Sequence, residues 1–156
     1  MAPAPTLHIE LCSTAFQPLE ALQHWHQRLA DTAGSAAAGA AESLFIGRVR
    51  GQAGDGTPLL ALELEHYPGM TERQLQQLAE MCCRRHGVSH GLVLHRIGRV
   101  LPGEAIVLVA ISADRRGPAQ RCSQELLEAL KHEAPFWKRE WRADGSRRWL
   151  SGNTPL

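Results

Sequence analysis

The segment KHEAPFWKRE, residues 131–140, forces the chain to change direction between two lysines. A helix running up to about Ala134 cannot continue through Pro135, because proline lacks the backbone N–H and its ring clashes with the preceding turn. Lys131 is therefore predicted in the last helical turn, and Lys138 on an extended segment that leaves in a new direction. Such a corner can bring both ammonium groups toward one point and suits an anionic small molecule. The alternative is an ordinary helix end, where lysine is favoured by the helix dipole and solvated.

Length and composition predict one soluble globular domain spanning residues 1–156. The chain is long enough to bury a core, and its 44% hydrophobic and 21% charged residues are ordinary for such a domain. A net charge of +1 argues against binding nucleic acid through overall charge, so an anion site must come from local clustering. The first residues lack the basic and apolar regions of a signal peptide, and the longest apolar run, 105–111, is too short to span a bilayer. We therefore expect a cytoplasmic protein without a membrane partner.

Neither the four cysteines nor the eight histidines form a metal-binding pattern. Cys82 and Cys83 are adjacent, and no CxxC pair is present to chelate zinc or carry redox chemistry. Cys82 falls on the apolar face of a predicted helix, which favours a buried, reduced thiol. His24 and His26 are two residues apart on a helix and face different sides, so they cannot share a metal. We predict no bound metal and no cofactor.

Apolar residues at helical spacing predict three helices. The first spans residues 18–30 and the third residues 118–133. The second opens at Thr71, which together with Gln74 predicts a capping box, and it stops at Gly87. The residues predicted to face inward are Leu19, Leu22, Trp25 and Leu29; Leu75, Leu78, Ala79 and Cys82; and Cys122, Leu126, Leu127 and Leu130.

Strands are predicted from runs of β-forming residues. Strict alternation places Leu60, Leu62 and Leu64 inward, and residues 105–112 are apolar on both faces, which predicts a central strand. Asp-Gly within the turn 143–146 predicts a C-terminal β-hairpin. Loops are expected at 32–41 and 51–56, and the predicted strands are 42–50, 60–65, 91–97, 105–112, 138–142 and 147–150. The expected fold class is α/β (α+β), with a mixed, mostly antiparallel sheet and packed helices.

Several charged residues lie near the ends of these predicted elements. Arg48 and Arg50 close a strand just before the glycine-rich loop, and residues 114–116 connect the central strand to the third helix. Ligands tend to bind at strand ends and helix starts, where guanidinium and backbone N–H groups both suit phosphate. Together with the two lysines, these residues predict a cationic pocket. Taken singly, each is also a typical solvated surface charge.

Five short motifs occur in order between about residues 45 and 149: GRVR (47–50), LEHYPGM (64–70), HRIG (95–98), PGE (102–104) and APFWKRE (134–140). Together they resemble the large, catalytic subunit of molybdopterin synthase. The resemblance implies a hammerhead-type fold and a homodimer within a heterotetramer, in which each large subunit binds a small ubiquitin-like sulfur carrier ending in a Gly-Gly thiocarboxylate. The implied reaction converts cyclic pyranopterin monophosphate into the dithiolene of molybdopterin through two sulfur transfers.

The resemblance also implies roles for individual residues. Lys131 corresponds to the family's most critical lysine and is assigned proton transfer or polarisation of the acyl group, with Lys138 as the second catalytic candidate. Lys138, Arg50 and Arg115 are expected to hold the phosphate and the donor's tail, since anionic substrates need positive charge. The implied substrate-binding residues are Arg48, Val49, Arg50, Asp114, Arg115, Lys131, Lys138, Arg139 and Glu140.

One position departs from the family pattern. Asp114 stands where the family has histidine, whereas Arg115 keeps the arginine. A carboxylate about 5 Å from a phosphate costs on the order of 3 kcal/mol at an effective dielectric of 20. One alternative is therefore a catalytically weak homologue that only binds the ubiquitin-like partner. Asp114 can instead cap the third helix or pair with Arg116.

A second alternative is an RNA-binding domain built on the C-terminal hairpin. Residues 131–149 carry an excess of basic residues interleaved with Trp137, Trp141 and Trp149. Basic side chains and aromatic rings in this arrangement can form a stacking platform for bases. The same pattern is also produced by half-buried strands that have no nucleic-acid partner.

Overall fold

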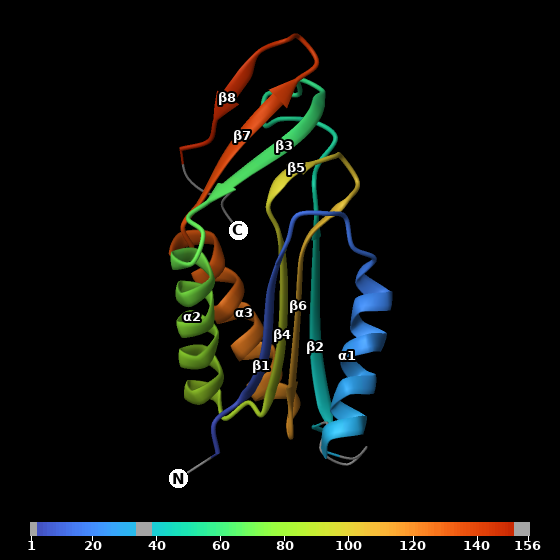
Figure 1. The fold of residues 1–156 in the computed structure, drawn as a ribbon, viewed down its shortest axis with the longest axis vertical. Helices are drawn as coiled ribbons and strands as arrows, with labels where there is room; N and C mark the ends of the chain where they lie inside the picture. The colour runs from blue at the N-terminus through green and yellow to red at the C-terminus, as the bar shows by residue number, and fades with distance from the viewer. Residues whose placement is uncertain (1–2, 34–38, 152–156) are drawn as a thin grey trace.

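Two four-stranded sheets and three helices make up the part of the chain that the computed structural model describes, residues 3–33 and 39–151 (Figure 1). The first sheet has the strand order β1-β4-β6-β2. Its β1–β4 pair is parallel and its other pairs are antiparallel, so the predicted mixed, mostly antiparallel α/β class is confirmed. Its strands are β1 (Thr6–Cys12), β4 (His90–Arg96), β6 (Ala105–Ala113) and β2 (Ala41–Arg48).

The second sheet has the order β5-β3-β7-β8 and is antiparallel throughout. It lies across one end of the first sheet, and the β7–β8 hairpin forms its outer edge (Figure 1). The C-terminal hairpin predicted from Asp-Gly is therefore confirmed. Its strands are β5 (Gly98–Val100), β3 (Leu59–His66), β7 (Phe136–Arg142) and β8 (Arg147–Trp149).

The helices α1 (Pro18–Ala33), α2 (Met70–His86) and α3 (Arg116–His132) cover both faces of the first sheet, with α2 and α3 on one side and α1 on the other (Figure 1). Strand β6 is central and alternates between the two layers, because successive side chains of a strand point to opposite faces. Val107 and Val109 pack toward α2 and α3, whereas Leu108 packs toward α1. The double-faced apolar pattern of residues 105–112 thus identified the central strand correctly. None of the described helices is long and apolar enough to cross a membrane.

Two inward-facing predictions are wrong. Leu19 is exposed, because the buried side of α1 follows Pro18, Trp25 and Leu29, and one residue further along a helix turns the side chain about 100° away. Leu60 is also exposed, because the pairing of β3 with β7 shifts register between Leu59 and Ala61. The extra residue reverses the alternation, and Ala61 is buried instead.

The predicted capping box at Thr71 and Gln74 is replaced by a different arrangement. Helix α2 begins at Met70, and Gly69 donates its backbone N–H to the Glu72 carboxylate. The Thr71 hydroxyl accepts a hydrogen bond from the Tyr67 N–H at 2.9 Å. Gly87 ends α2 in the left-handed region, φ 66°, as predicted.

The sequence analysis missed two strands and misplaced one loop. Strand β1 precedes the first predicted element, and β5 is a three-residue strand between β4 and β6. Of the predicted loop 32–41, residues 32–33 extend α1 and Ala41 opens β2, while 34–38 lie outside the described residues. Strand β5 has only three residues, which is too short to show the alternation of apolar and polar residues that predicts a strand.

Candidate functional site

A cavity of about 240 Å³ lies where the end of β2, the end of α3 and the strand β7 meet. Its polar lining consists of Arg48, Arg50, His95, Lys131 and Lys138. Its walls are otherwise apolar and include Phe45, Ile106, Val107, Leu127 and Leu130. The structure therefore brings together four of the predicted cationic residues on one chain.

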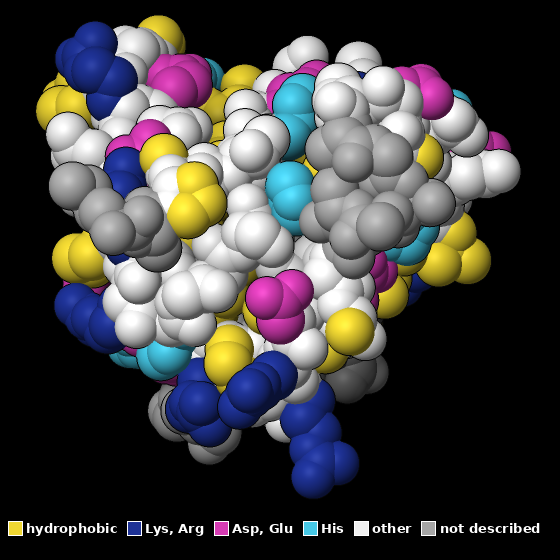
Figure 2. All heavy atoms as spheres, turned by 90° about the horizontal axis from the view of Figure 1, so that it is seen from below, with side chains coloured by type: hydrophobic (Ala, Val, Ile, Leu, Met, Phe, Trp, Pro, Cys, Tyr) yellow, Lys and Arg dark blue, Asp and Glu magenta, His cyan; other side chains and the backbone are white. Residues whose placement is uncertain are grey.

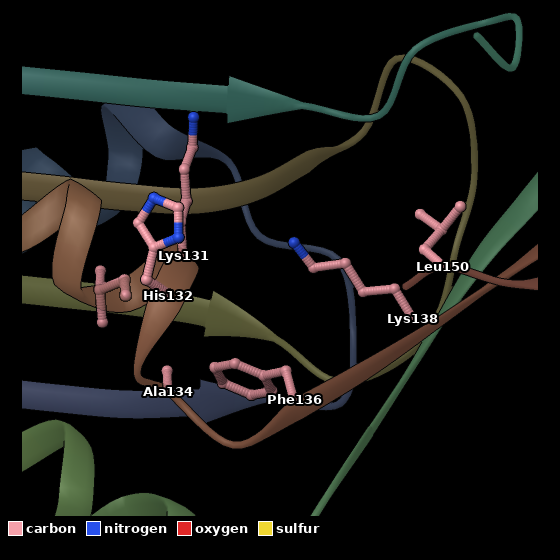
Figure 3. Close-up of a pocket in the computed structure, with 7 residues that line it drawn as sticks. Lys131, His132, Ala134, Phe136, Lys138 and Leu150 are labelled. Atoms are coloured by element: carbon pink, nitrogen blue, oxygen red, sulfur yellow. The ribbon is translucent and has the colours of Figure 1, made fainter. Parts of the chain in front are cut away.

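A second hollow of about 190 Å³ adjoins this cavity and shares Lys131 and Lys138 with it. Figure 3 shows Lys131 at the end of α3 and Lys138 reaching from β7 toward it, with Phe136 and Leu150 nearby. The two lysines thus stand at the junction of two hollows.

The corner between the lysines is held by the first turns of α2. Helix α3 ends at His132, and β7 begins at Phe136, as the position of Pro135 predicted. The Gln74 side-chain amide donates to the Glu133 carbonyl at 2.9 Å, and the Thr71 hydroxyl donates to the Pro135 carbonyl at 3.4 Å. Thr71 and Gln74, which were expected to cap α2, therefore hold the corner around Pro135 in place. The corner in turn determines where Lys131 and Lys138 lie.

Lys138 is a partly buried amine. Burial lowers its pKa below the ordinary lysine value, and the charge of Lys131 lowers it further. Both effects favour the neutral amine, because desolvation and a nearby like charge each disfavour the ammonium form. A neutral amine can accept a proton or act as a nucleophile, so the lowered pKa makes Lys138 a candidate for chemistry as well as for binding anions.

The sequence uses lysine at this cavity and arginine at all its other basic positions, which is a signal for the site that composition alone provides. Lys131 and Lys138 are the only lysines in the chain, and the other fifteen of its seventeen Lys and Arg residues are arginines. Arginine stays charged in proteins, whereas lysine can lose its proton when it is buried or placed beside another cation. The two side chains able to exchange a proton in this way are both placed at one cavity.

His95 is a member of the site that the sequence analysis did not assign. It is only 6% exposed and lines the cavity beside both lysines. Its Nδ1–H donates to the Arg96 carbonyl at 2.8 Å, and its ring stacks on Phe136 with centroids 4.1 Å apart. The motif HRIG contained this residue, but a search for metal pairs among the histidines could not single it out.

In the predicted segment 48–50, the two arginines line the cavity and the valine between them points into the core. Val49 is buried, and its backbone N–H donates to the Glu104 carbonyl at 3.0 Å while its carbonyl accepts from Gly103. The Val49 N–H is therefore already bonded within the fold. Arg48 and Arg50 lie on either side of it and line the cavity, and one Arg48 nitrogen donates to the Gly103 carbonyl at 3.3 Å.

Arg139 and Glu140, although implied as substrate-binding, do not line either hollow. Arg139 lies on the other face of β7 from Lys138, where it pairs with Glu63 at 3.0 Å and covers the Trp149 ring at 4.8 Å. Glu140 is buried and accepts a hydrogen bond from Arg142 at 3.0 Å. Within this chain, both residues have structural contacts that stabilise the second sheet.

Asp114 and Arg115 lie far from the cavity within one chain. Because β2 and β6 are antiparallel, Arg48 pairs with Ala105 at one end of β6, whereas Asp114 follows Ala113 at the other end. At about 3.3 Å per residue, the two ends are roughly 26 Å apart. The expected single pocket that also contains residues 114–116 is therefore not formed by one chain.

The cap predicted for α3 is also not formed. Arg115 occupies the N-cap position, without a side-chain cap hydrogen bond.

Figure 2 shows the end of the molecule opposite the β7–β8 hairpin, where basic side chains occur in separate groups among acidic, histidine and apolar ones. The described residues on this face do not form a continuous basic surface.

Three of the four cysteines belong to the buried core of this fold. Cys82, Cys83 and Cys122 are free and buried between α2 and α3, with the Cys83 and Cys122 sulfurs 3.8 Å apart. Burial raises the pKa of the Cys82 thiol to about 11, which keeps it protonated. Within residues 3–33 and 39–151, no group of three or more potential ligands is arranged to hold a metal ion.

Comparisons of sequence and of structure relate this chain to one group of known proteins. A family model described as "MoaE protein" matches residues 17–133. The molybdopterin synthase catalytic subunit of Ralstonia nicotianae is 44% identical over 103 residues, a match that covers 66% of this chain and 58% of that protein. The structure resembles the MoaE protein of Burkholderia ambifaria, with a TM-score of 0.70, 35% identity and coverage of 96% and 91% of the two chains. A similar fold occurs in the Helicobacter pylori complex of subunits 1 and 2 of molybdopterin-converting factor, with a TM-score of 0.72, 20% identity and coverage of 91% and 89%.

Proposed function

Because the chain belongs to the MoaE protein family, we propose that it is the catalytic subunit of a molybdopterin synthase. In this role it is a sulfurtransferase that converts cyclic pyranopterin monophosphate into molybdopterin. The sulfur comes from the C-terminal thiocarboxylate of a small ubiquitin-like subunit. The reaction takes place in the cytoplasm.

The observation that carries this proposal is the junction of two hollows at Lys131 and Lys138. Sulfur transfer has to bring two anions together, a phosphate-bearing pterin and a thiocarboxylate, and their repulsion must be offset by positive charge. The larger hollow, which contains Arg48 and Arg50, suits the pterin phosphate. The smaller one, which is lined by Phe136 and Leu150, suits the extended tail of the partner.

The two lysines fit the two stages of each transfer. The donor sulfur first attacks a substrate carbon and displaces an oxygen from it, and that oxygen leaves with the electron pair of the broken carbon–oxygen bond. The acyl group of the donor is then joined to the transferred sulfur. Water then attacks the acyl carbon, the carbon–sulfur bond breaks, and the partner leaves as a carboxylate. Lys131, as an ammonium, polarises the acyl oxygen, and Lys138, whose pKa is lowered, removes a proton from the attacking water.

The partner has an apolar surface to dock on at the edge of the second sheet. Tyr67, Trp137 and Trp149 are about half exposed and line a hollow on the face of β7 opposite Lys138, and Leu150, which follows Trp149, lines the smaller hollow with the lysines. Exposed apolar side chains grouped in this way mark interaction sites. A globular partner bound here can insert its tail toward Lys131 and Lys138.

Asp114 and Arg115 can join the site through a second copy of the chain. The resemblance implies that they contact substrate, yet one chain places them at the opposite end of β6 from the cavity. Both statements hold if, in a homodimer, each copy extends its β6–α3 connection to the cavity of the other. We therefore propose the homodimer within a heterotetramer as the active assembly.

A binding module without catalysis was suggested by Asp114 facing the substrate. Asp114 lies outside the cavity of its own chain but reaches the cavity of the other copy in the proposed homodimer, so an activity assay has to separate this alternative from the proposed function. The RNA-binding alternative receives less support. RNA stacking needs free ring faces, whereas Arg147 covers the Trp141 ring at 3.7 Å and Arg139 covers Trp149.

The deciding experiment is reconstitution. The purified chain is mixed with the small sulfur carrier in its thiocarboxylate form and with cyclic pyranopterin monophosphate, and molybdopterin is measured after conversion to a fluorescent oxidation product. Formation of molybdopterin that depends on both proteins is expected. A complex that forms but makes no product would leave only the binding-module function.

A further inference from the structure

The charged side chains that line the cavity with Arg48 and Arg50 can donate hydrogen bonds but cannot accept them. Arginine and lysine side chains donate hydrogen bonds and have no acceptor when charged. The remaining described side chains of the lining are apolar, apart from His95. His95 is therefore the residue of this lining with a side-chain nitrogen that can accept a hydrogen bond whatever the charge of the lysines.

The orientation of His95 is fixed by two contacts. Its Nδ1–H donates to the Arg96 carbonyl, so the proton of the neutral ring is held on Nδ1 and the lone pair is left on Nε2. The parallel stack on Phe136, with 11° between the ring planes, fixes the plane of the imidazole. The acceptor nitrogen is thus positioned before any ligand arrives.

The surroundings also keep His95 neutral. Burial lowers its pKa to about 4 and the charge of Lys138 contributes, while the bond to the Arg96 carbonyl acts in the other direction. The charged groups facing it across the cavity are Arg48 at the end of β2, Arg50 just after that strand, Lys131 on α3 and Lys138 on β7. Burial and the charge of Lys138 both disfavour an imidazolium, so Nε2 keeps its lone pair at neutral pH.

We propose that Nε2 of His95 accepts a hydrogen bond from a ring N–H of the reduced pterin and thereby orients the ring in the cavity. This inference rests on the proposed function and assigns a recognition residue within it. A reduced pterin presents several N–H donors, and a lining of cations has no place for them. The cations hold the phosphate, and His95 selects the heterocycle.

Two substitutions separate recognition from structure. Asparagine places its amide near the position of Nδ1, so His95→Asn keeps a donor for the Arg96 carbonyl and removes the acceptor at the Nε2 position. Glutamine is one methylene longer and its amide reaches toward the Nε2 position. The matched pair therefore differs mainly in whether an acceptor faces the cavity.

Binding is measured by calorimetry on the full chain with two probes, a tetrahydropterin without phosphate and inorganic phosphate. His95→Asn is expected to weaken tetrahydropterin binding about tenfold to a hundredfold, because a buried donor is left without a partner. Phosphate binding should stay within about twofold of wild type, and His95→Gln should bind tetrahydropterin within about threefold. Equal tetrahydropterin affinity of wild type and His95→Asn would overturn the inference.

Nitrogen NMR of the wild-type ring gives a second measurement that needs no variant to fold. Tetrahydropterin should shift the Nε2 resonance of His95 and leave Nδ1 nearly unchanged, whereas a movement confined to Nδ1 would contradict the proposal. The proposed function is tested separately by reconstitution. A wild type that makes molybdopterin while His95→Asn binds tetrahydropterin normally would reject only the role of His95, and a wild type that binds no pterin at all would reject both.

Discussion

The charge of Lys131 lowers the pKa of Lys138 across the Pro135 corner, in addition to the larger effect of burial. The two amines belong to different elements, and a continuous helix in place of the corner would direct them to separate points along its surface. Their proximity links binding to chemistry, because the same like-charge pair attracts an anion and releases a proton more readily.

Replacing Lys131 should impair chemistry far more than folding. Lys131→Ala is expected to reduce molybdopterin formation at least a hundredfold, roughly the contribution of a proton-transfer or polarising group, and to change the melting temperature by only a few degrees. Gln124→Ala, an exposed position of α3 that lines neither hollow, is the matched control and should keep most of the activity. Near-normal turnover by Lys131→Ala would remove this residue from the mechanism.

The lowered pKa of Lys138 predicts its reactivity. Only a neutral amine reacts with an acylating reagent, so Lys138 should be labelled at lower pH than an ordinary lysine. In Lys131→Met the neighbouring charge is absent, the pKa of Lys138 rises, and the midpoint of labelling should move to higher pH. Because the chain has just two lysines, mass spectrometry can follow the labelling of this one directly. An unchanged midpoint would show that burial alone controls the amine.

The partner's tail should tolerate no extension. It has to enter a hollow of about 190 Å³ in extended form and end at the two lysines. One bulky residue added after its last glycine should abolish sulfur transfer while the globular part still docks on the surface around Trp137. Activity and complex formation are measured on the same samples, with an alanine extension as the milder comparison. Turnover supported by the bulky extension would refute insertion of the tail.

Mixed dimers test whether the site is shared between copies. Lys131→Ala and Arg115→Ala should each be inactive alone. In a mixed dimer, one of the two sites combines an intact Lys131 with an intact Arg115 from the other copy. Random mixing therefore restores roughly a quarter of wild-type activity. If both residues act within the same copy, mixing restores nothing.

His95 predicts a pH dependence of stability. The folded protein holds its pKa at about 4, against an ordinary value of 6.5, so the unfolded chain binds the proton more tightly. Stability from this group is complete above pH 6.5 and is lost as the pH falls toward 4, by on the order of 2 to 3 kcal/mol. Urea unfolding at pH 7.5 and 4.5 should show this loss for wild type but not for His95→Asn. Equal losses in the two proteins would assign the effect to other groups.

Several features of the fold could be predicted because they depend on residues close in sequence. Pro135 stops α3 because proline cannot continue a helix beyond its first turn, Gly87 stops α2 because glycine accepts a positive φ, and Asp-Gly turns the C-terminal hairpin. The apolar character of residues 105–112 on both faces identified β6 as central, because a strand covered on two sides needs two apolar faces.

The sequence by itself therefore determined the three helices, six of the eight described strands, the corner and the pair of lysines beside it. Tertiary structure decided which of the other charged residues join them. The antiparallel pairing of β2 with β6 carries Arg48 to the cavity and Asp114 away from it, and the bulge near Leu60 reverses one face of β3. The tertiary structure also decided the proposed role of His95. The Arg96 carbonyl holds the ring proton on Nδ1 and the Phe136 ring fixes the plane of the imidazole, which leaves Nε2 as the acceptor nitrogen. Strand pairing and side-chain contacts join residues far apart in the chain, and local propensity does not specify them.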